Sequence, residues 1–397
     1  MTDLIRTACR LPTVMNMFNS IMSDLIAGMS VVWVMPATAP RADLISELAD
    51  ILEERAIEAI ADDIPESLGD CMRHQADEGS SYVSVHSLDK PMSLSERKSI
   101  IAQLEECGKA ATVQSRETGR ISSRVVVVSD ATFGYEANSC KHIAVHWSWG
   151  CFTTTEMSIL AQYISQDRTI ESAHAVWTQS VMAELAGTDV GLLQQLYIHW
   201  EPDFSEDDLC DILREYATRR EWVDECMRLQ MKNIHGTYRA GRQNKPPCPP
   251  QQLASLFEAG ILEWRMDSGI SVHSAALAQN ADVSEIRRRI WAGQAKYLMP
   301  VIDMERIKTC RYLEESDPGL NDAVDTLRLK PGNPNEWHNN WTTPEWSELI
   351  SYIDTMCSGR YISLRRRADF MRMRRNDLAH CTPISWEHFR MILTGEA

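Results

Sequence analysis

Near the carboxyl end of the chain, an arginine, an asparagine and a histidine stand at a spacing that suits phosphodiester chemistry. From residue 372 the sequence reads Arg-Met-Arg-Arg-Asn-Asp-Leu-Ala-His, and the apolar positions around it predict a helix. Asn376 and His380 are four residues apart and share a helical face, while Arg375 lies one residue off that face. An imidazole can remove a proton near neutral pH, and a guanidinium can hold the charge of a phosphorane. RNA supplies its own nucleophile, the 2′-hydroxyl, so this chemistry requires no metal.

The motif resembles that of the HEPN family, whose ribonucleases carry an arginine and a histidine separated by four to six residues, often with asparagine directly after the arginine. The resemblance covers about residues 284–397. An asparagine after Arg375 and an alanine before His380 make it more specific than the spacing alone. The resemblance implies a helical bundle that forms a homodimer, places two motifs face to face, and leaves 2′,3′-cyclic phosphate ends on RNA.

The resemblance also implies a role for each residue of the motif. Arg375 and His380 would be catalytic, and Asn376 would orient or bind the phosphate. Arg372 and Arg374 would contact the RNA substrate. Fusions within this family are typical of bacterial anti-phage defence or toxin systems, which implies a protein partner that senses infection or restrains the nuclease. The leading interpretation is therefore a metal-independent endoribonuclease effector.

Two other interpretations of the motif remain open. Arg375 and His380 could be a surface pair at the carboxyl end of a helix, where positive charge is favoured. Some members of the family are non-catalytic bundles that bind or dimerise. The alternative function is a scaffold subunit of a defence complex whose chemistry resides in a partner.

The first 165 residues alternate helices with short β-branched strands, which is typical of an α/β layer with a parallel sheet. The pattern predicts helices over 11–27, 41–54 and 156–164, and strands over 30–35, 82–86, 124–130 and 142–147. Hydroxyls of the threonine run 153–155 are expected to cap the last of these helices. The acidic stretch 41–70 is expected to be the solvated face of helices.

A nucleotide-binding protein of the P-loop type would place G-x-x-x-x-G-K-[ST] after the first strand, because glycine amides and a lysine hold phosphate. Residues 36–43 read Pro-Ala-Thr-Ala-Pro-Arg-Ala-Asp, with no glycine, no lysine and two prolines that lack an amide donor. The strand ending at Asp130 vaguely resembles a Walker B strand. The layer is thus similar to a P-loop ATPase core that has lost its phosphate grip, and we expect neither ATPase activity nor a bound cofactor.

A metal site is also not expected. Cys140, His142 and His146 have the same parity on a presumed strand and Cys151 follows closely, yet no second ligand pair has zinc-finger spacing. Isolated cysteines and histidines in strands belong more often to the core or the surface.

The remaining sequence divides into three parts. Residues 166–238 are helical in pattern, and 239–283 hold a proline-rich linker followed by a helix and a hairpin that suggest a small winged-helix-like module. Residues 284–397 predict helices over 286–315, 345–356, 362–380 and 386–393, with a Pro/Gly/Asn loop at 331–344. The expected architecture is α/β plus all-α: residues 1–165 form the P-loop-like parallel-sheet layer, and 284–397 the carboxyl-terminal helical bundle.

The chain of 397 residues has 40 Lys and Arg against 56 Asp and Glu, a formal charge of −16. Residues 360–397 hold eight Arg and four acids, a balance of +4, which leaves −20 on the rest. This distribution confines any RNA site to the carboxyl-terminal helices and leaves an acidic body suited to protein partners. The 11 cysteines form no C-x-x-C pair, and the sequence begins with no signal peptide and contains no apolar stretch suited to a membrane, so we expect a cytoplasmic protein.

Overall fold

The computed structural model describes most of the chain. The described residues are 2–54, 58–63, 82–88, 92–118, 124–150, 152–166, 171–203, 205–222, 234, 248–265, 269–280, 282–316, 344–356, 359 and 361–396. The predicted loop at 331–344 lies outside them except for residue 344, as does most of the linker.

The amino-terminal part is built on a parallel sheet, as predicted. Its five described strands are β1 (Ser30–Val34), β2 (Glu58–Asp63), β3 (Tyr82–Ser87), β4 (Arg124–Ser129) and β5 (Ile143–Trp147), in the order β2-β3-β4-β1-β5. Val31 is in register with Val126 of β4 on one side and with Ala144 of β5 on the other. Every residue of β1 is buried, since the strand lies between β4 and β5 and is covered on both faces.

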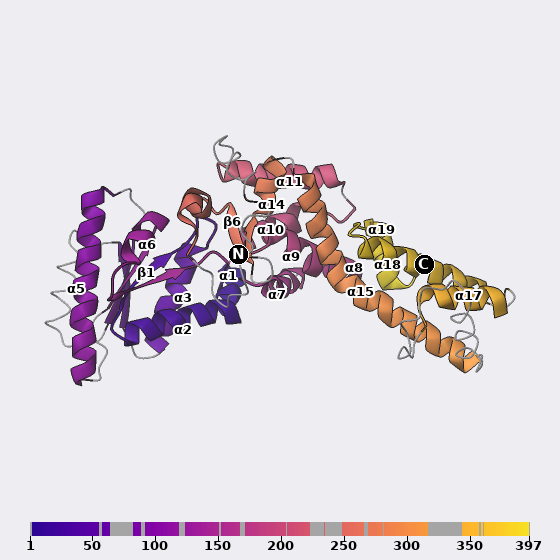
Figure 1. Cartoon of the computed structure of the whole chain (residues 1–397), viewed down its shortest axis with the longest axis horizontal. Coiled ribbons are helices and arrows are strands. Elements are labelled where there is room, and N and C mark those ends of the chain that lie inside the picture. Colours follow the sequence, from indigo (N-terminus) through magenta and orange to yellow (C-terminus); the bar gives the residue numbers. More distant parts are fainter. Residues whose placement is uncertain are drawn as a thin grey trace, which may run out of the picture.

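Helices pack against the sheet and the segments beside it. They are α1 (Thr2–Cys9), α2 (Pro12–Ile26), α3 (Arg41–Glu54), α5 (Leu94–Thr118) and α6 (Ala131–Ala137). The predicted helix over 11–27 is confirmed as α2, which buries Val14, Phe18 and Leu25. The long helix α5, which crosses the far end of the layer (Figure 1), was not predicted from the sequence.

The expectation that the whole acidic stretch 41–70 forms helix faces is wrong. Residues 41–54 are helical, but Glu58–Asp63 form β2, which pairs in parallel with β3. The strand lies at the edge of the sheet, where charged residues are well tolerated, and its acidic composition hides the strand pattern.

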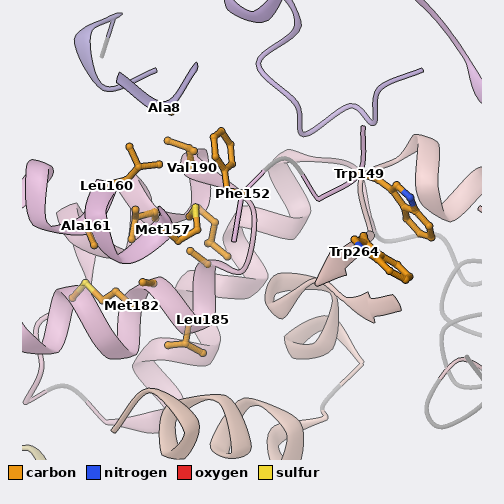
Figure 2. Close-up of a cluster of buried hydrophobic side chains, with 14 of the residues drawn as sticks. Ala8, Trp149, Phe152, Met157, Leu160, Ala161, Met182, Leu185, Val190 and Trp264 are labelled. Atoms are coloured by element: carbon orange, nitrogen blue, oxygen red, sulfur yellow. The ribbon is translucent and has the colours of Figure 1, made fainter. Parts of the chain in front are cut away.

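A helical region follows the sheet. Its elements are α7 (Thr154–Ser165), α8 (Ser172–Trp177), the π-helical turn η1 (Thr178–Met182), α9 (Ala183–Ala186), α10 (Val190–His199) and α11 (Glu206–Arg219). The predicted cap of α7 is confirmed, because Thr153 accepts a hydrogen bond from the Glu156 amide in a capping box. Figure 2 shows Met157 and Leu160 of α7 in one buried cluster with Ala8 of α1, which ties this region to the amino terminus.

The predicted helix and hairpin are also present. They comprise η2 (Gln251–Leu253), α13 (Ala254–Glu258), β6 (Leu262–Arg265) and β7 (Gly269–Val272), followed by α14 (Ser274–Gln279). The hairpin joins the main body, because the Trp264 amide donates to the Trp149 carbonyl just beyond β5, and the two indoles lie 6.0 Å apart (Figure 2).

The carboxyl-terminal part is helical, as predicted. The helix α15 (Val283–Ser316) runs from the helical region out to α17 (Trp346–Met356), α18 (Ile362–Ala379) and α19 (Trp386–Thr394), which lie along it (Figure 1). No helix in the described residues is long and apolar enough to cross a membrane.

Candidate active site at the end of helix α18

Helix α18 ends in a tight turn that carries the histidine of the motif. Ala379 is the last helical residue and His380 is the carboxyl-terminal cap. The Thr382 amide donates to the Asp377 carbonyl at 2.9 Å, and the Cys381 amide donates to the Leu378 carbonyl at 3.2 Å. Cys381 has φ 59°, a left-handed conformation that glycine usually supplies at this position. The backbone beside His380 is therefore strained, as is common at functional sites.

Arg375 and His380 are both exposed at this helix end, whereas Asn376 is half-buried. Within the described part of the chain, neither Arg375 nor His380 has a hydrogen bond or ion pair through its side chain. Asn376 and His380 lie four residues apart along one side of the helix end. His380 follows Arg375 by five positions, which along a helix is a rotation of about 140°, so the arginine side chain must reach around the helix end to meet the imidazole.

Helix α15 holds this turn in place. The Trp291 indole donates to the Leu378 carbonyl at 2.6 Å. The Gln294 side-chain amide donates to the Ile384 carbonyl at 2.8 Å and accepts from the Ile384 amide at 2.9 Å. Gln294 is fully buried. Both backbone anchors lie close to His380 in the sequence, one before it and one after it, so α15 fixes the backbone that carries the imidazole.

Sequence reasoning did not find Trp291 or Gln294. Both lie more than eighty residues before the segment that they hold, and a tryptophan or glutamine in a helix carries no local signal of such a contact.

The two arginines expected to contact RNA are engaged within the protein. Arg372 forms an ion pair with Asp369 at 2.8 Å. The Arg374 guanidinium donates to Nδ1 of His388 at 2.9 Å and lies over the Phe370 ring. Partial burial and the positive charge of Arg374 together lower the pKa of His388. Arg375 thus differs from Arg372 and Arg374, because its side chain has no partner in the described residues whereas theirs do.

The two histidines weighed as metal ligands have other contacts. The Nε2 atom of His146 lies 2.8 Å from a carboxylate oxygen of Asp24, and His142 lies near Thr112. Burial raises the pKa of the Cys140 thiol, which disfavours the thiolate that binds metal. No group of three or more potential ligands is found among the described residues, which do not include Cys151.

The loop after β1 has few amides to offer a phosphate. Pro36 and Pro40 have no amide proton. The Ala37 amide donates to the Glu258 carbonyl at 2.9 Å, and the Ala39 amide donates to the Pro36 carbonyl at 3.1 Å. These amides are therefore used within the protein.

The chain was compared with known proteins at the level of sequence and of structure. Among solved structures, the RuvB Holliday junction branch migration motor of Thermotoga maritima is similar over 67% of this chain and 92% of that chain, with 14% identity and a TM-score of 0.33. No protein-family model matches the chain, and no curated protein matches it.

Proposed function

We propose that the carboxyl-terminal helices form a metal-independent endoribonuclease. The observation that carries the proposal is the pairing pattern along α18. Arg365, Arg367 and Arg372 are each bound to a carboxylate, whereas Arg375 is exposed and unpaired in the described residues, at the helix end that also exposes His380. An unpaired guanidinium and an unpaired imidazole at one helix end, whose backbone is held by α15, are suited to bind and cleave a phosphodiester. The resemblance of the motif to that of HEPN ribonucleases supports the same reading.

In this mechanism, the His380 imidazole takes the proton of a 2′-hydroxyl. The 2′-oxygen attacks the adjacent phosphorus, and the bond from phosphorus to the 5′-oxygen breaks. Arg375 stabilises the charge on the phosphorane, and Asn376 orients the phosphate. The leaving 5′-oxygen receives a proton from a protonated imidazole of a second copy. The products are a 2′,3′-cyclic phosphate and a 5′-hydroxyl, and the site is composite in a homodimer.

The wider proposal concerns the rest of the chain. The amino-terminal sheet belongs to a P-loop-like domain that lacks a phosphate-binding loop, and the hairpin region forms a winged-helix-like module. The acidic body receives a protein partner that senses infection or restrains the nuclease in a cytoplasmic defence or toxin system. The net charge of −20 outside residues 360–397 supports a protein rather than a nucleic acid as the ligand of this body.

The test is cleavage of mixed RNAs by the full chain in EDTA, followed by analysis of the cut ends. We expect cyclic phosphate ends with the wild-type protein, and a loss of rate of about 100-fold or more in His380→Ala and Arg375→Ala. Arg366→Ala is the matched control, because Arg366 is exposed on the same helix and unpaired in the described residues. Full cleavage by a folded His380→Ala protein would show that the proposal is wrong.

A further inference from the structure

A cavity of about 280 Å³ opens at the carboxyl edge of the sheet, far from helix α18 in the sequence. Its walls include the loop 36–40 after β1, residues 148–150 and 152 after β5, the start of α10, strand β6 and His273. The chain leaves β1 for the far edge of the sheet and later returns to place β4 and β5 on either side of it. In open parallel sheets such a change of direction, at the carboxyl ends of the strands, is where ligands bind.

One wall of the cavity contains a buried carboxylate, Asp189. One of its oxygens accepts from the amides of Gly191 and Leu192, at 2.8 and 3.2 Å. The other accepts from the Tyr216 hydroxyl at 2.6 Å and lies 3.3 Å from Nε2 of His273. Burial alone would raise the pKa of Asp189, but these hydrogen bonds and the charges nearby outweigh it and hold the pKa below its ordinary value. Asp189 is thus ionised, and both of its carboxylate oxygens have partners. Its hydrogen bonds hold the Tyr216 hydroxyl and the start of α10 in place.

The neighbour that faces the cavity is Arg220. Its Nη2 donates to the Tyr216 hydroxyl at 3.0 Å, its Nη1 donates to the Ala37 carbonyl at 3.2 Å, and the guanidinium lies over the Tyr216 ring. No carboxylate of the described residues lies within ion-pair distance of the Arg220 guanidinium, although Arg220 and the buried Asp189 interact electrostatically. The next residue, Glu221, has φ 59°, so the backbone is strained where it presents this arginine. A fixed guanidinium with donors to spare suits a planar or tetrahedral anion.

The rest of the lining limits how much negative charge the cavity can take. The acidic side chain of Glu263 is already paired with Arg265 and Arg289, at 2.8 and 3.4 Å. Asp43 and the ionised Asp189 add negative charge to the lining. No lysine is present in the lining, and the loop amides of Ala37 and Ala39 are used within the protein, as described above. A chain of phosphates would therefore be poorly neutralised here, whereas one anionic group can be met by Arg220.

The other lining residues include apolar and aromatic side chains beside polar ones such as Thr188 and Gln194. Trp149, Phe152, Val190 and Leu262 contribute to the wall, and each is buried in the protein. Apolar and aromatic walls with a few fixed polar groups are typical of sites for small molecules.

We propose that this cavity binds a small molecule that carries one anionic group, a carboxylate or a phosphate monoester, on an apolar body. Arg220 holds the anion and the aromatic wall covers the body. The proposal is independent of the ribonuclease activity, because it concerns a different part of the molecule and is tested by binding alone.

The test is titration of the full chain with 1-naphthoate, 1-naphthyl phosphate, the neutral analogue 1-naphthalenemethanol, and ATP with Mg²⁺. We expect at least one naphthyl anion to bind at least tenfold more tightly than the alcohol and more tightly than ATP; its identity distinguishes a carboxylate from a phosphate. Arg220→Gln should weaken that anion at least tenfold. Arg219→Gln is the matched control, since Arg219 contacts Gln195 and Glu215 instead of the cavity.

Three results would overturn the proposal: neither naphthyl anion binds, the alcohol or ATP binds as tightly as the better anion, or the variants at 219 and 220 weaken binding equally. Thermal melting shows whether Arg220→Gln remains folded. If it does not, Arg220→Lys is the second variant, because lysine keeps the positive charge and the aliphatic stem but lacks the planar guanidinium. Unchanged affinity for the anion in Arg220→Lys would refute recognition by the guanidinium.

Discussion

Replacing Gln294 with methionine tests whether α15 holds the His380 turn. Methionine has a similar size but cannot make the two hydrogen bonds to the backbone of Ile384. A buried backbone group left without a partner costs about 1–3 kcal/mol, so the loss is roughly 2–6 kcal/mol for the two groups. Even 2 kcal/mol multiplies the population of a released turn about 30-fold. We therefore expect the Ile384 amide to exchange its hydrogen with solvent about 30-fold faster or more.

The assay is hydrogen exchange of residues 378–384 by mass spectrometry or NMR, together with RNA cleavage. A misplaced imidazole should lower kcat about 10- to 100-fold while KM changes little. Tyr297→Met is the control, because Tyr297 lies one turn further along α15 and is exposed. Wild-type exchange at Ile384 in Gln294→Met would refute the reasoning, whatever the ribonuclease assay shows.

Three further outcomes are expected. Cys381→Gly should raise the free energy of unfolding by about 1 kcal/mol in urea titrations, because glycine adopts the left-handed conformation without strain; a loss of stability would contradict this. Asp189→Asn should destabilise the protein at neutral pH. Since the folded pKa of Asp189 is depressed, the stability difference from wild type should hold above about pH 4, the unfolded pKa, and shrink as pH falls through the folded value; a difference that grows in acid would be inconsistent. Arg374→Met should raise the pKa of His388 in an NMR titration, because a nearby positive charge is removed; an unchanged or lower pKa would disprove that cause.

Much of the fold could be predicted because its signals are local. The valine run 125–128 and the apolar residues of 30–35 identify buried strands, and the 3.6-residue period identifies α2 and the helices after 284. Strand β2 was missed because an acidic edge strand lacks that apolar signal. Its pairing with β3 is a tertiary contact that the local sequence does not reveal.

The contacts that build both candidate sites are long-range, and local patterns do not reveal them. The cavity brings together residues 36–40, Asp189, Arg220 and His273, which are spread over more than half of the chain. The sequence around each of these residues carries no motif that marks a binding site. They come into contact with one cavity only because the sheet, the helical region and the hairpin pack together.

The sequence by itself placed Arg375, Asn376 and His380 at the same end of one helix, because helical spacing is a local property of the backbone. It also placed the positive charge of an acidic protein in the last helices. Only the tertiary structure decided that Arg374 is engaged and Arg375 is not, since Arg374 donates to His388 of α19, whereas Arg375 has no side-chain partner in the described residues. It also decided that Gln294 fixes the turn, because a buried amide can bond only to the backbone groups that packing brings to it.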